Sequence, residues 1–181
     1  EQWVFPYAGT AEQPEAQWET DAELMAAAGF NVVRIGEFSW GLCEPADGQF
    51  DFAWLRRGMD IMGRYDIQVV LGTPTAAPPL WLAKDHPEIL PLDECGQIKH
   101  EGTRRAVCLN SDAYWNHAKR IVEEMAKTLG DHPQLIAWQI DNGIGSHFTE
   151  ASFNEGSRLE WQNWLKLKYQ TIERLNNLMG L

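Results

Sequence analysis

The stretch Trp138-Gln-Ile-Asp-Asn-Gly-Ile-Gly145 decides the fold of this chain. An apolar run from Leu135 to Ile140 leads into the polar pair Asp141 and Asn142 and then into two glycines. Such a run is typical of a strand that is covered on both faces, as in a parallel sheet. Parallel α/β barrels carry their chemistry at the carboxyl ends of the strands, so the polar pair marks a candidate site. An ordinary Asp-Asn-Gly turn explains the same residues, and composition alone does not separate the two interpretations.

The rest of the chain alternates strand-like and helix-like segments. Four strands are expected, at Val4–Ala8, Asn31–Ile35, Ile67–Leu71 and Leu135–Ile140. Helices with apolar residues at helical spacing are expected at Gln17–Ala28, after Asp51, at Asp112–Leu129, at Ser157–Tyr169 and, as a short amphipathic segment, at Thr171–Leu181. Because each parallel strand needs a crossover, we predict an α/β chain of the (β/α)8 TIM-barrel type that covers about the first four β/α units.

A complete barrel takes about 250 residues, so residues 1–181 are interpreted as the N-terminal part of a barrel domain. An open half-barrel leaves two strand edges and an apolar lining exposed. We therefore expect further chain, or another copy, to close it, and we expect the 181-residue chain alone to be inactive and not to fold as a stable monomer.

Composition excludes several classes of partner. Lys and Arg total 15 against 26 Asp and Glu, and a net charge of −11 argues against nucleic acid and anionic membrane surfaces. No apolar run reaches the length of a membrane span, and the first residues do not resemble a signal peptide. Three widely spaced cysteines predict a reducing compartment, the cytoplasm. Nine Trp suit a core, and they also suit stacking on sugar rings.

Five strings in order carry a family resemblance. They are Trp18-x-x-Asp21, Asn31–Trp40, Gly72–Pro79, Thr103-Arg-Arg105 and Ala137–Asn142. Together they resemble the N-terminal half of the glycoside hydrolase family 42 β-galactosidases. The resemblance implies a retaining glycosidase of carbohydrate metabolism that hydrolyses terminal β-D-galactosyl residues. It places the acid/base after strand four and the nucleophile after strand seven, outside this chain. It also implies a galactoside or oligosaccharide as substrate and a homo-oligomer, a trimer, at full length.

The family's acid/base position reads Gly143 in this sequence. A retaining glycosidase needs two carboxyl groups, and glycine has none. General acid/base catalysis commonly contributes about 10²- to 10⁴-fold, so substrates with poor leaving groups are expected to suffer. Asp141, Glu150 and Glu155 are the nearby carboxylates that remain as substitutes, although loop carboxylates are usually solvated. The alternative function is a catalytically impaired or non-catalytic galactoside-binding barrel.

The resemblance also implies substrate-binding residues. Asn142 matches an Asn that hydrogen-bonds the sugar near its 2-hydroxyl, and the alternative is an Asn that stabilises a turn. Arg104 matches an Arg that reaches the substrate. Glu37 is a further candidate because it follows a strand, although an ion pair with Arg34 explains it equally well. For Arg105 a structural ion pair is the preferred interpretation.

Many members of the family hold a structural zinc through one Cys after the double-Arg segment and three more beyond the acid/base. Cys108 matches the first, but the other three positions are Ser152, Asn154 and Ser157. Hydroxyls and an amide do not replace thiolates for zinc, and one nearby His147 does not complete a set. We therefore predict no metal and no other cofactor, and we expect Cys108 to be a small buried residue.

Overall fold

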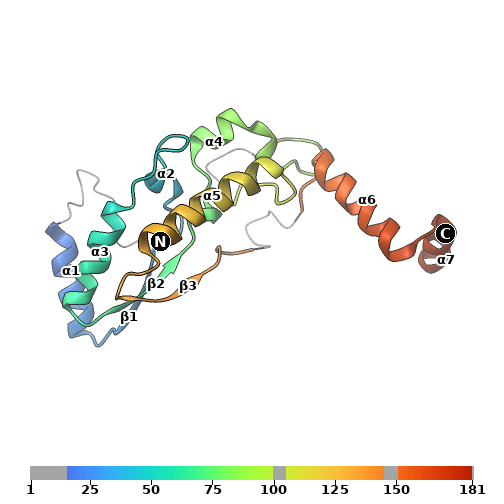
Figure 1. The fold of residues 1–181 in the computed structure, drawn as a ribbon. Helices are drawn as coiled ribbons and strands as arrows, with labels where there is room; N and C mark the ends of the chain where they lie inside the picture. Colours follow the sequence, from blue (N-terminus) through green and yellow to red (C-terminus); the bar gives the residue numbers. More distant parts are fainter. Residues whose placement is uncertain (1–15, 100–104, 145–150, 181) are drawn as a thin grey trace.

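The computed structural model describes residues 16–99, 105–144 and 151–180, arranged as Figure 1 shows. Its elements are α1 (Ala16–Ala27), β1 (Val32–Ile35), α2 (Trp40–Cys43), α3 (Ala53–Arg64), β2 (Gln68–Gly72), η1 (Pro74–Ala76), α4 (Leu80–Asp85), η2 (Pro87–Ile89), α5 (Asp112–Leu129), β3 (Leu135–Gln139), α6 (Glu155–Tyr169) and α7 (Ile172–Met179). The strand expected at Val4–Ala8 lies outside the described residues. The strand expected at Leu135–Ile140 is β3.

The three strands form one parallel sheet in the order β1-β2-β3. Ile35 at the end of β1 lies beside Leu71, and Gly72 at the end of β2 lies beside Gln139. Helices α2 and α3 connect β1 with β2, and helices α4 and α5 connect β2 with β3. This confirms the predicted parallel α/β organisation, and it brings the carboxyl ends of all three strands to one edge of the sheet.

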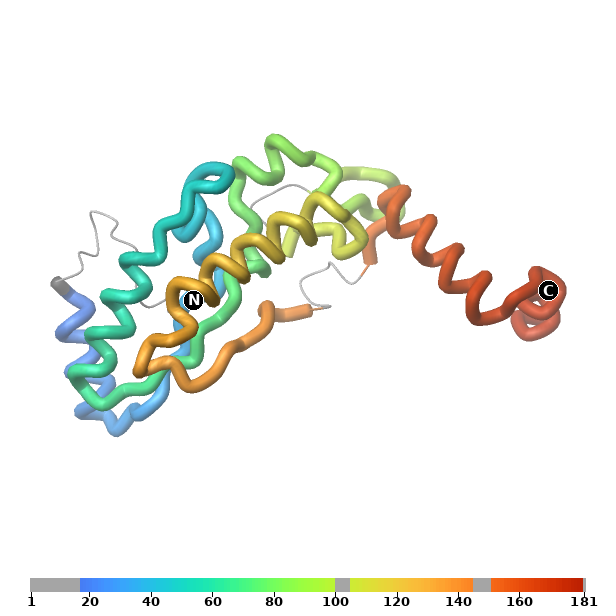
Figure 2. Tube along the Cα trace, in the orientation of Figure 1, coloured from blue at the N-terminus to red at the C-terminus, as the bar shows by residue number. Residues whose placement is uncertain are grey.

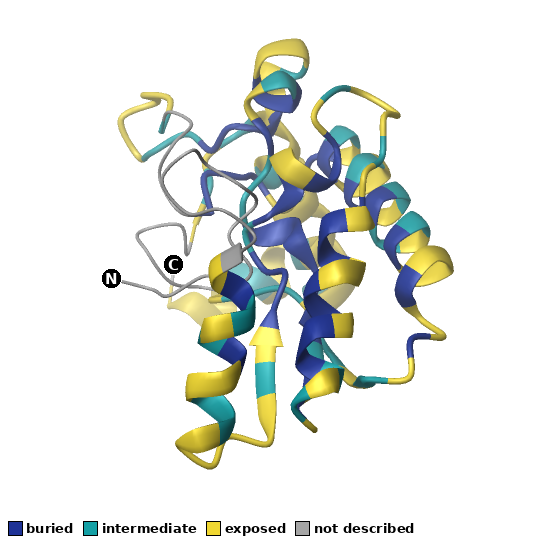
Figure 3. Ribbon diagram, turned by 90° about the vertical axis from the view of Figure 1, so that its left-hand side faces the viewer, coloured by how far each residue is buried: buried dark blue, intermediate teal, exposed yellow. Residues whose placement is uncertain are grey.

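Helices α3 and α5 lie against one face of the sheet (Figure 1) and turn their buried residues toward it (Figure 3). Phe52 is the N-cap of α3, and the Oδ1 of the preceding Asp51 accepts the Ala53 N–H at 2.9 Å. The Ser111 side chain accepts the Tyr114 N–H at the start of α5. The buried stripes are Leu55, Met59 and Met62 in α3 and Ala118, Ile121, Met125 and Leu129 in α5. In α5 a polar N-cap precedes the apolar stripe, and the helix has the predicted bounds.

Strand β3 is less covered than its apolar sequence predicts. Leu135 and Trp138 pack against the core, but Ile136 is 47% exposed and Ile140, just past the strand, is 74% exposed. Within the described residues β3 pairs only with β2, so its other edge is open. The apolar run therefore fits a strand with a further neighbour, and closure by more chain or by another copy stays a prediction.

Helices α6 and α7 extend away from the sheet (Figure 2). Neither helix has a buried residue, and apolar side chains such as Trp164, Leu167 and Ile172 are exposed on them. Further packing would bury these faces. In the described part of the chain, no helix is both long enough and apolar enough to cross a membrane.

Gly36 makes the tight turn that follows β1. Its φ is +94°, and a Cβ there would lie 3.0 Å from Leu71 Cδ1 and 3.2 Å from the Gly72 carbonyl oxygen. Gly36→Ala is expected to lower the free energy of unfolding by about 2 to 5 kcal/mol, because left-handed strain adds to overpacking. Gly29→Ala is the control, since Gly29 has φ +84° but no neighbour within 4 Å. Urea denaturation that gave equal losses for the two variants would contradict this account.

A buried carboxylate, Glu44, ties the loop after α2 to α4 and α5. Its Oε2 accepts the Trp40 Nε1–H at 2.8 Å, and its Oε1 accepts the Gly48 N–H at 2.9 Å. Oε1 also forms an ion pair with Arg120 of α5. The Glu44 carbonyl accepts the Trp81 Nε1–H from α4 at 2.8 Å. Because each carboxylate oxygen and the carbonyl of Glu44 accept a hydrogen bond, the loop after α2 is held in one position.

His117 of α5 lies beside this cluster. Burial and the neighbouring Arg120 cation lower the pKa of His117 below its ordinary value of 6.5, with a smaller contribution from His86, while Asp47 and Glu44 oppose the shift. The unfolded chain therefore binds a proton at His117 before the folded chain does, so acidification below about pH 6.5 reduces stability. His117→Gln is expected to flatten the fall in the urea midpoint between about pH 7 and 5. An unchanged pH profile in the variant would exclude His117 as the titrating group.

Candidate active site

The carboxyl ends of the three strands bring polar residues together at one edge of the sheet, which we call the mouth. The Thr73 N–H donates to the Gln139 carbonyl at 2.9 Å and so extends the pairing of β2 with β3. The Asp141 N–H then donates to Thr73 Oγ1 at 2.7 Å. Glu37 follows β1 and lies over Gly72, where an added Cβ would be 3.1 Å from Glu37 Oε2. Glu37, Thr73 and Asp141 thus follow β1, β2 and β3, respectively, and together they line the mouth.

Asp141 is held in the mouth by two other segments. Thr75 Oγ1 donates to Asp141 Oδ2 at 3.1 Å, and Arg105 forms an ion pair with Oδ1. Arg105 Nη1 also donates to the Asn142 carbonyl at 2.8 Å. The side chains of Arg105 and Asp141 are 2% and 13% exposed. Both oxygens of this partly buried carboxylate are occupied, which indicates a structural role, and the interpretation of Arg105 as an ion-pair residue is confirmed.

Sequence reasoning missed Thr73, Thr75 and Tyr114. The two threonine hydroxyls lie 3.3 Å apart, and the Tyr114 hydroxyl donates to the Thr75 carbonyl at 3.2 Å. Burial, with the charge of Asp141 adding to it, raises the pKa of Tyr114 to about 12. The sequence does hold a signal, a Thr-x-Thr pair directly after the apolar run of β2. Its partner Asp141 is 66 to 68 residues away, which no local pattern reveals.

The backbone leaves strand geometry after Gln139. Asp141 has φ +56° and Gly143 has φ +68°, both in the left-handed region. The alternation of side chains along a strand therefore does not extend to residues 141–143.

Three of the predicted site residues, Glu37, Asn142 and Gly143, lie at the mouth, whereas Arg104 lies outside the described residues. Glu37 forms the ion pair with Arg34 that the alternative interpretation requires. The Glu37 side chain is 10% exposed and that of Arg34 is 54% exposed, so only the carboxylate of this ion pair is shielded from solvent. The Glu37 carboxylate is therefore part of the wall of the mouth.

Asp141 and Glu155, two of the carboxylates near position 143, already have partners. Glu155 begins α6 and pairs with Arg158, with side-chain exposures of 66% and 51%. The hydrogen bond from Arg158 lowers the pKa of Glu155, which makes this carboxyl a poorer proton donor near neutral pH. Glu150 lies outside the described residues. Both oxygens of Asp141 are already engaged.

The fold and the mouth define a class of protein, part of a (β/α)8 barrel with a polar site at the carboxyl ends of its parallel strands. Sequence comparison identifies the family. The family profile described as β-galactosidase, that of glycoside hydrolase family 42, matches residues 10–181. The chain belongs to this family, as the five strings predicted.

Individual relatives agree with this assignment. The β-galactosidase structure from Halorubrum lacusprofundi is 41% identical with a TM-score of 0.89, over 92% of this chain and 25% of that one. The β-galactosidase structure from Marinomonas ef1 is 39% identical with a TM-score of 0.88, over 94% and 26%. A curated Thermus β-galactosidase is 40% identical over 167 residues, which are 92% of this chain and 26% of the relative. The chain spans about a quarter of the length of the curated relatives it matches.

Proposed function

We propose that the protein, at its full natural length, is a retaining hydrolase of terminal β-D-galactosyl residues, with Gly143 at the acid/base position and the nucleophile outside this chain. The observation that carries the proposal is a polar mouth at the ends of β1, β2 and β3 in a chain of the β-galactosidase family. Residues 1–181 then supply the N-terminal part of the catalytic barrel domain. The substrate is a galactoside or an oligosaccharide used in carbohydrate metabolism.

Each residue at the mouth has a role in this proposal. Asn142 hydrogen-bonds the sugar near its 2-hydroxyl, a contact that strengthens in the transition state. Arg104, which lies outside the described residues, is assigned contact with the substrate on the family resemblance alone, and Glu37 forms part of the wall of the mouth. Arg105 is a positioning residue, because it holds both the Asp141 carboxylate and the Asn142 carbonyl and so fixes the direction in which the chain leaves β3.

Gly143 changes which substrates react. The first step of retaining hydrolysis breaks the bond between the anomeric carbon and the leaving oxygen. When the leaving group is a second sugar, this oxygen needs a proton to leave. A nitrophenolate leaves without one. The second step needs a base to take a proton from water, and that base is also missing at Gly143. We therefore propose turnover of activated galactosides and little turnover of lactose.

A second candidate function is a non-catalytic galactoside-binding barrel. The engagement of Asp141 by Arg105 and Thr75 favours it, since this carboxylate is not arranged to replace the missing acid. Such a protein keeps the sugar contacts of Asn142 and Arg104 and performs no hydrolysis.

We further propose a cytoplasmic homo-oligomer, a trimer, that uses no cofactor and binds neither nucleic acid nor membranes. The net charge of −11 supports the exclusion of polyanionic partners. The trimer follows from the family resemblance, in which the substrate subsite is completed across subunits. Light scattering on the purified full-length protein measures its mass directly, and a monomer would overturn this part of the proposal.

Release of nitrophenol from nitrophenyl β-galactoside, with and without azide, separates the two functions. If the protein is an enzyme, slow release is expected to accelerate in azide. Azide attacks the anomeric carbon of the galactosyl-enzyme, frees the nucleophile carboxylate and gives β-galactosyl azide, so no base is needed. Calorimetric binding of galactose without any nitrophenol release would overturn the hydrolase and support the binding protein.

A further inference from the structure

The segment that precedes α6 is fastened to the loop after η2 by one asparagine. Asn154 Oδ1 accepts the Leu92 N–H at 2.9 Å, and Asn154 Nδ2 donates to the Leu90 carbonyl at 2.9 Å. The neighbouring Phe153 N–H donates to the Leu92 carbonyl at 3.0 Å. A primary amide carries a donor and an acceptor side by side, so the side chain pairs with this backbone as a strand would.

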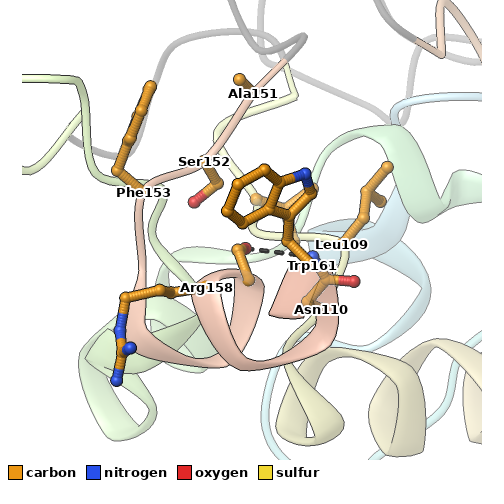
Figure 4. Close-up of a pocket in the computed structure, with 9 residues that line it drawn as sticks. Leu109, Asn110, Ala151, Ser152, Phe153, Arg158 and Trp161 are labelled. Carbon is orange, nitrogen blue, oxygen red and sulfur yellow. Dashed lines mark hydrogen bonds between the residues drawn. The ribbon is translucent and has the colours of Figure 1, made fainter. Parts of the chain in front are cut away.

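A second fastening lies at the start of α6. The Cys108 thiol is 3.3 Å from the Ser157 hydroxyl. Asn110 Nδ2 donates to Ser157 Oγ at 3.0 Å, the hydrogen bond drawn as a dashed line in Figure 4. Cys108 is buried, as predicted, at 2% exposure, and its N–H donates to the Ile89 carbonyl at 2.6 Å. Within the segment before α6, Ser152 Oγ donates to Asn154 Oδ1. We call Cys108, Ser152, Asn154 and Ser157 the clasp.

The clasp occupies the four positions at which the family resemblance implies zinc ligands, and its donors do not fit that metal. A closed structural zinc site takes four thiolate or imidazole ligands, whereas the clasp offers one thiol, two hydroxyls and one amide. Both ends of the amide are bonded to backbone. Across residues 16–99, 105–144 and 151–180, no group of three His, Cys, Asp or Glu side chains is placed to hold a metal ion.

We infer that in this protein hydrogen bonds of the clasp hold the segment before α6 in place, and that no zinc is bound there. Apart from the local bond between Ser152 and Asn154, these bonds join segments far apart along the chain, 62 residues for Asn154 with Leu92 and 49 for Ser157 with Cys108. The clasp therefore connects the segment before α6 and the start of α6 to the loop after η2 and to the loop before α5. It also fixes one wall of the pocket in Figure 4, which Asn110, Ser152 and Ser157 help to line.

A hydrogen-bonded clasp and a metal clasp respond differently to chelators. The hydrogen-bonded clasp stays formed at any zinc concentration. A zinc site, in contrast, no longer holds the segments that carry its ligands once the ion is removed. The difference is a property of the wild-type protein, so its measurement does not depend on whether a variant folds. It also does not depend on galactoside turnover.

Zinc analysis of the full-length protein by mass spectrometry tests the inference first. We expect far less than one zinc per chain and a thermal midpoint that is unchanged by EDTA. Asn154→Ala removes three hydrogen bonds, two of them to the backbone of the loop after η2, and proteolytic cleavage within residues 151–157 is expected to become about tenfold faster. Asn177→Ala, on an exposed position of α7, is the matched control and is expected to leave the cleavage rate unchanged. One tightly bound zinc per chain, or an Asn154→Ala variant cleaved at the wild-type rate, would overturn the clasp.

Discussion

Gly143→Glu in the full-length protein is expected to raise kcat on lactose by about 10²- to 10⁴-fold, the usual contribution of a positioned acid and base. The glutamate supplies a proton to the leaving sugar oxygen and later takes one from water. A nitrophenyl galactoside needs no proton in its first step, so the gain on that substrate is expected to be smaller. The ratio of the two gains is therefore the informative measurement, with initial rates on both substrates at saturating concentration.

The backbone at position 143 adds a cost to the same variant. Its φ of +68° suits glycine, and a side chain there costs about 1 to 2 kcal/mol. Gly143→Gln is the control, because it carries the same strain and a side chain of nearly the same size but has no titratable proton. We expect Gly143→Gln to be as destabilised as Gly143→Glu and to gain nothing on lactose. Equal activity of the two variants, or no gain in a folded Gly143→Glu protein, would remove position 143 from the acid/base role.

The elements of the fold were predictable because their signals are local. Helix α5 begins and ends where its cap and apolar stripe indicate, from Asp112 to Leu129. Gly29 stands at the end of α1 with φ +84°, the left-handed geometry expected of a C-terminal cap. Strand β3 was also predictable as a strand, whereas its exposure was not. Burial depends on which segments lie beside a strand, and in the described part of the chain only β2 does.

The sequence predicted where the mouth lies in the fold, but it did not predict which side chains bond to one another there. The strand-end rule placed Glu37, Asp141 and Asn142 in one region, because parallel strands share an edge. The network of Thr73, Thr75 and Asp141 depends on the register of β2 with β3 and on the left-handed backbone at Asp141. Neither is encoded in a short window of sequence.

The significance of Gly143 came from resemblance alone, since glycine after Asn is ordinary turn chemistry. What the structure adds is the state of its neighbours. Asp141 and Glu155 are paired with Arg105 and Arg158, so the two described carboxylates considered as substitutes already have partners. The proposed loss of the acid at position 143 and the occupied neighbours together give this sequence departure a chemical consequence, and they direct the test to position 143 itself.

Arg105→Met is expected to lower the free energy of unfolding by about 3 to 5 kcal/mol, the usual effect of removing one partner of a buried ion pair. The Asp141 carboxylate, 13% exposed, would lose its cation, and the Asn142 carbonyl would lose its donor. Asp141→Asn is expected to cost a similar amount, because it leaves the Arg105 guanidinium buried without its counter-charge. Urea denaturation of each variant measures the loss, and galactose affinity is expected to fall with it because Asn142 is no longer held.

The matched control for this prediction is Arg158→Met, which breaks the ion pair with Glu155 at side-chain exposures of 51% and 66%. An exposed pair contributes about 0 to 1 kcal/mol, so the two arginine variants should differ severalfold in their loss of stability. The Arg105→Met/Asp141→Asn double variant completes a thermodynamic cycle, and its loss is expected to be well below the sum of the single losses. Strict additivity would mean that Arg105 and Asp141 act independently, and their ion pair would then not be what holds the end of β3.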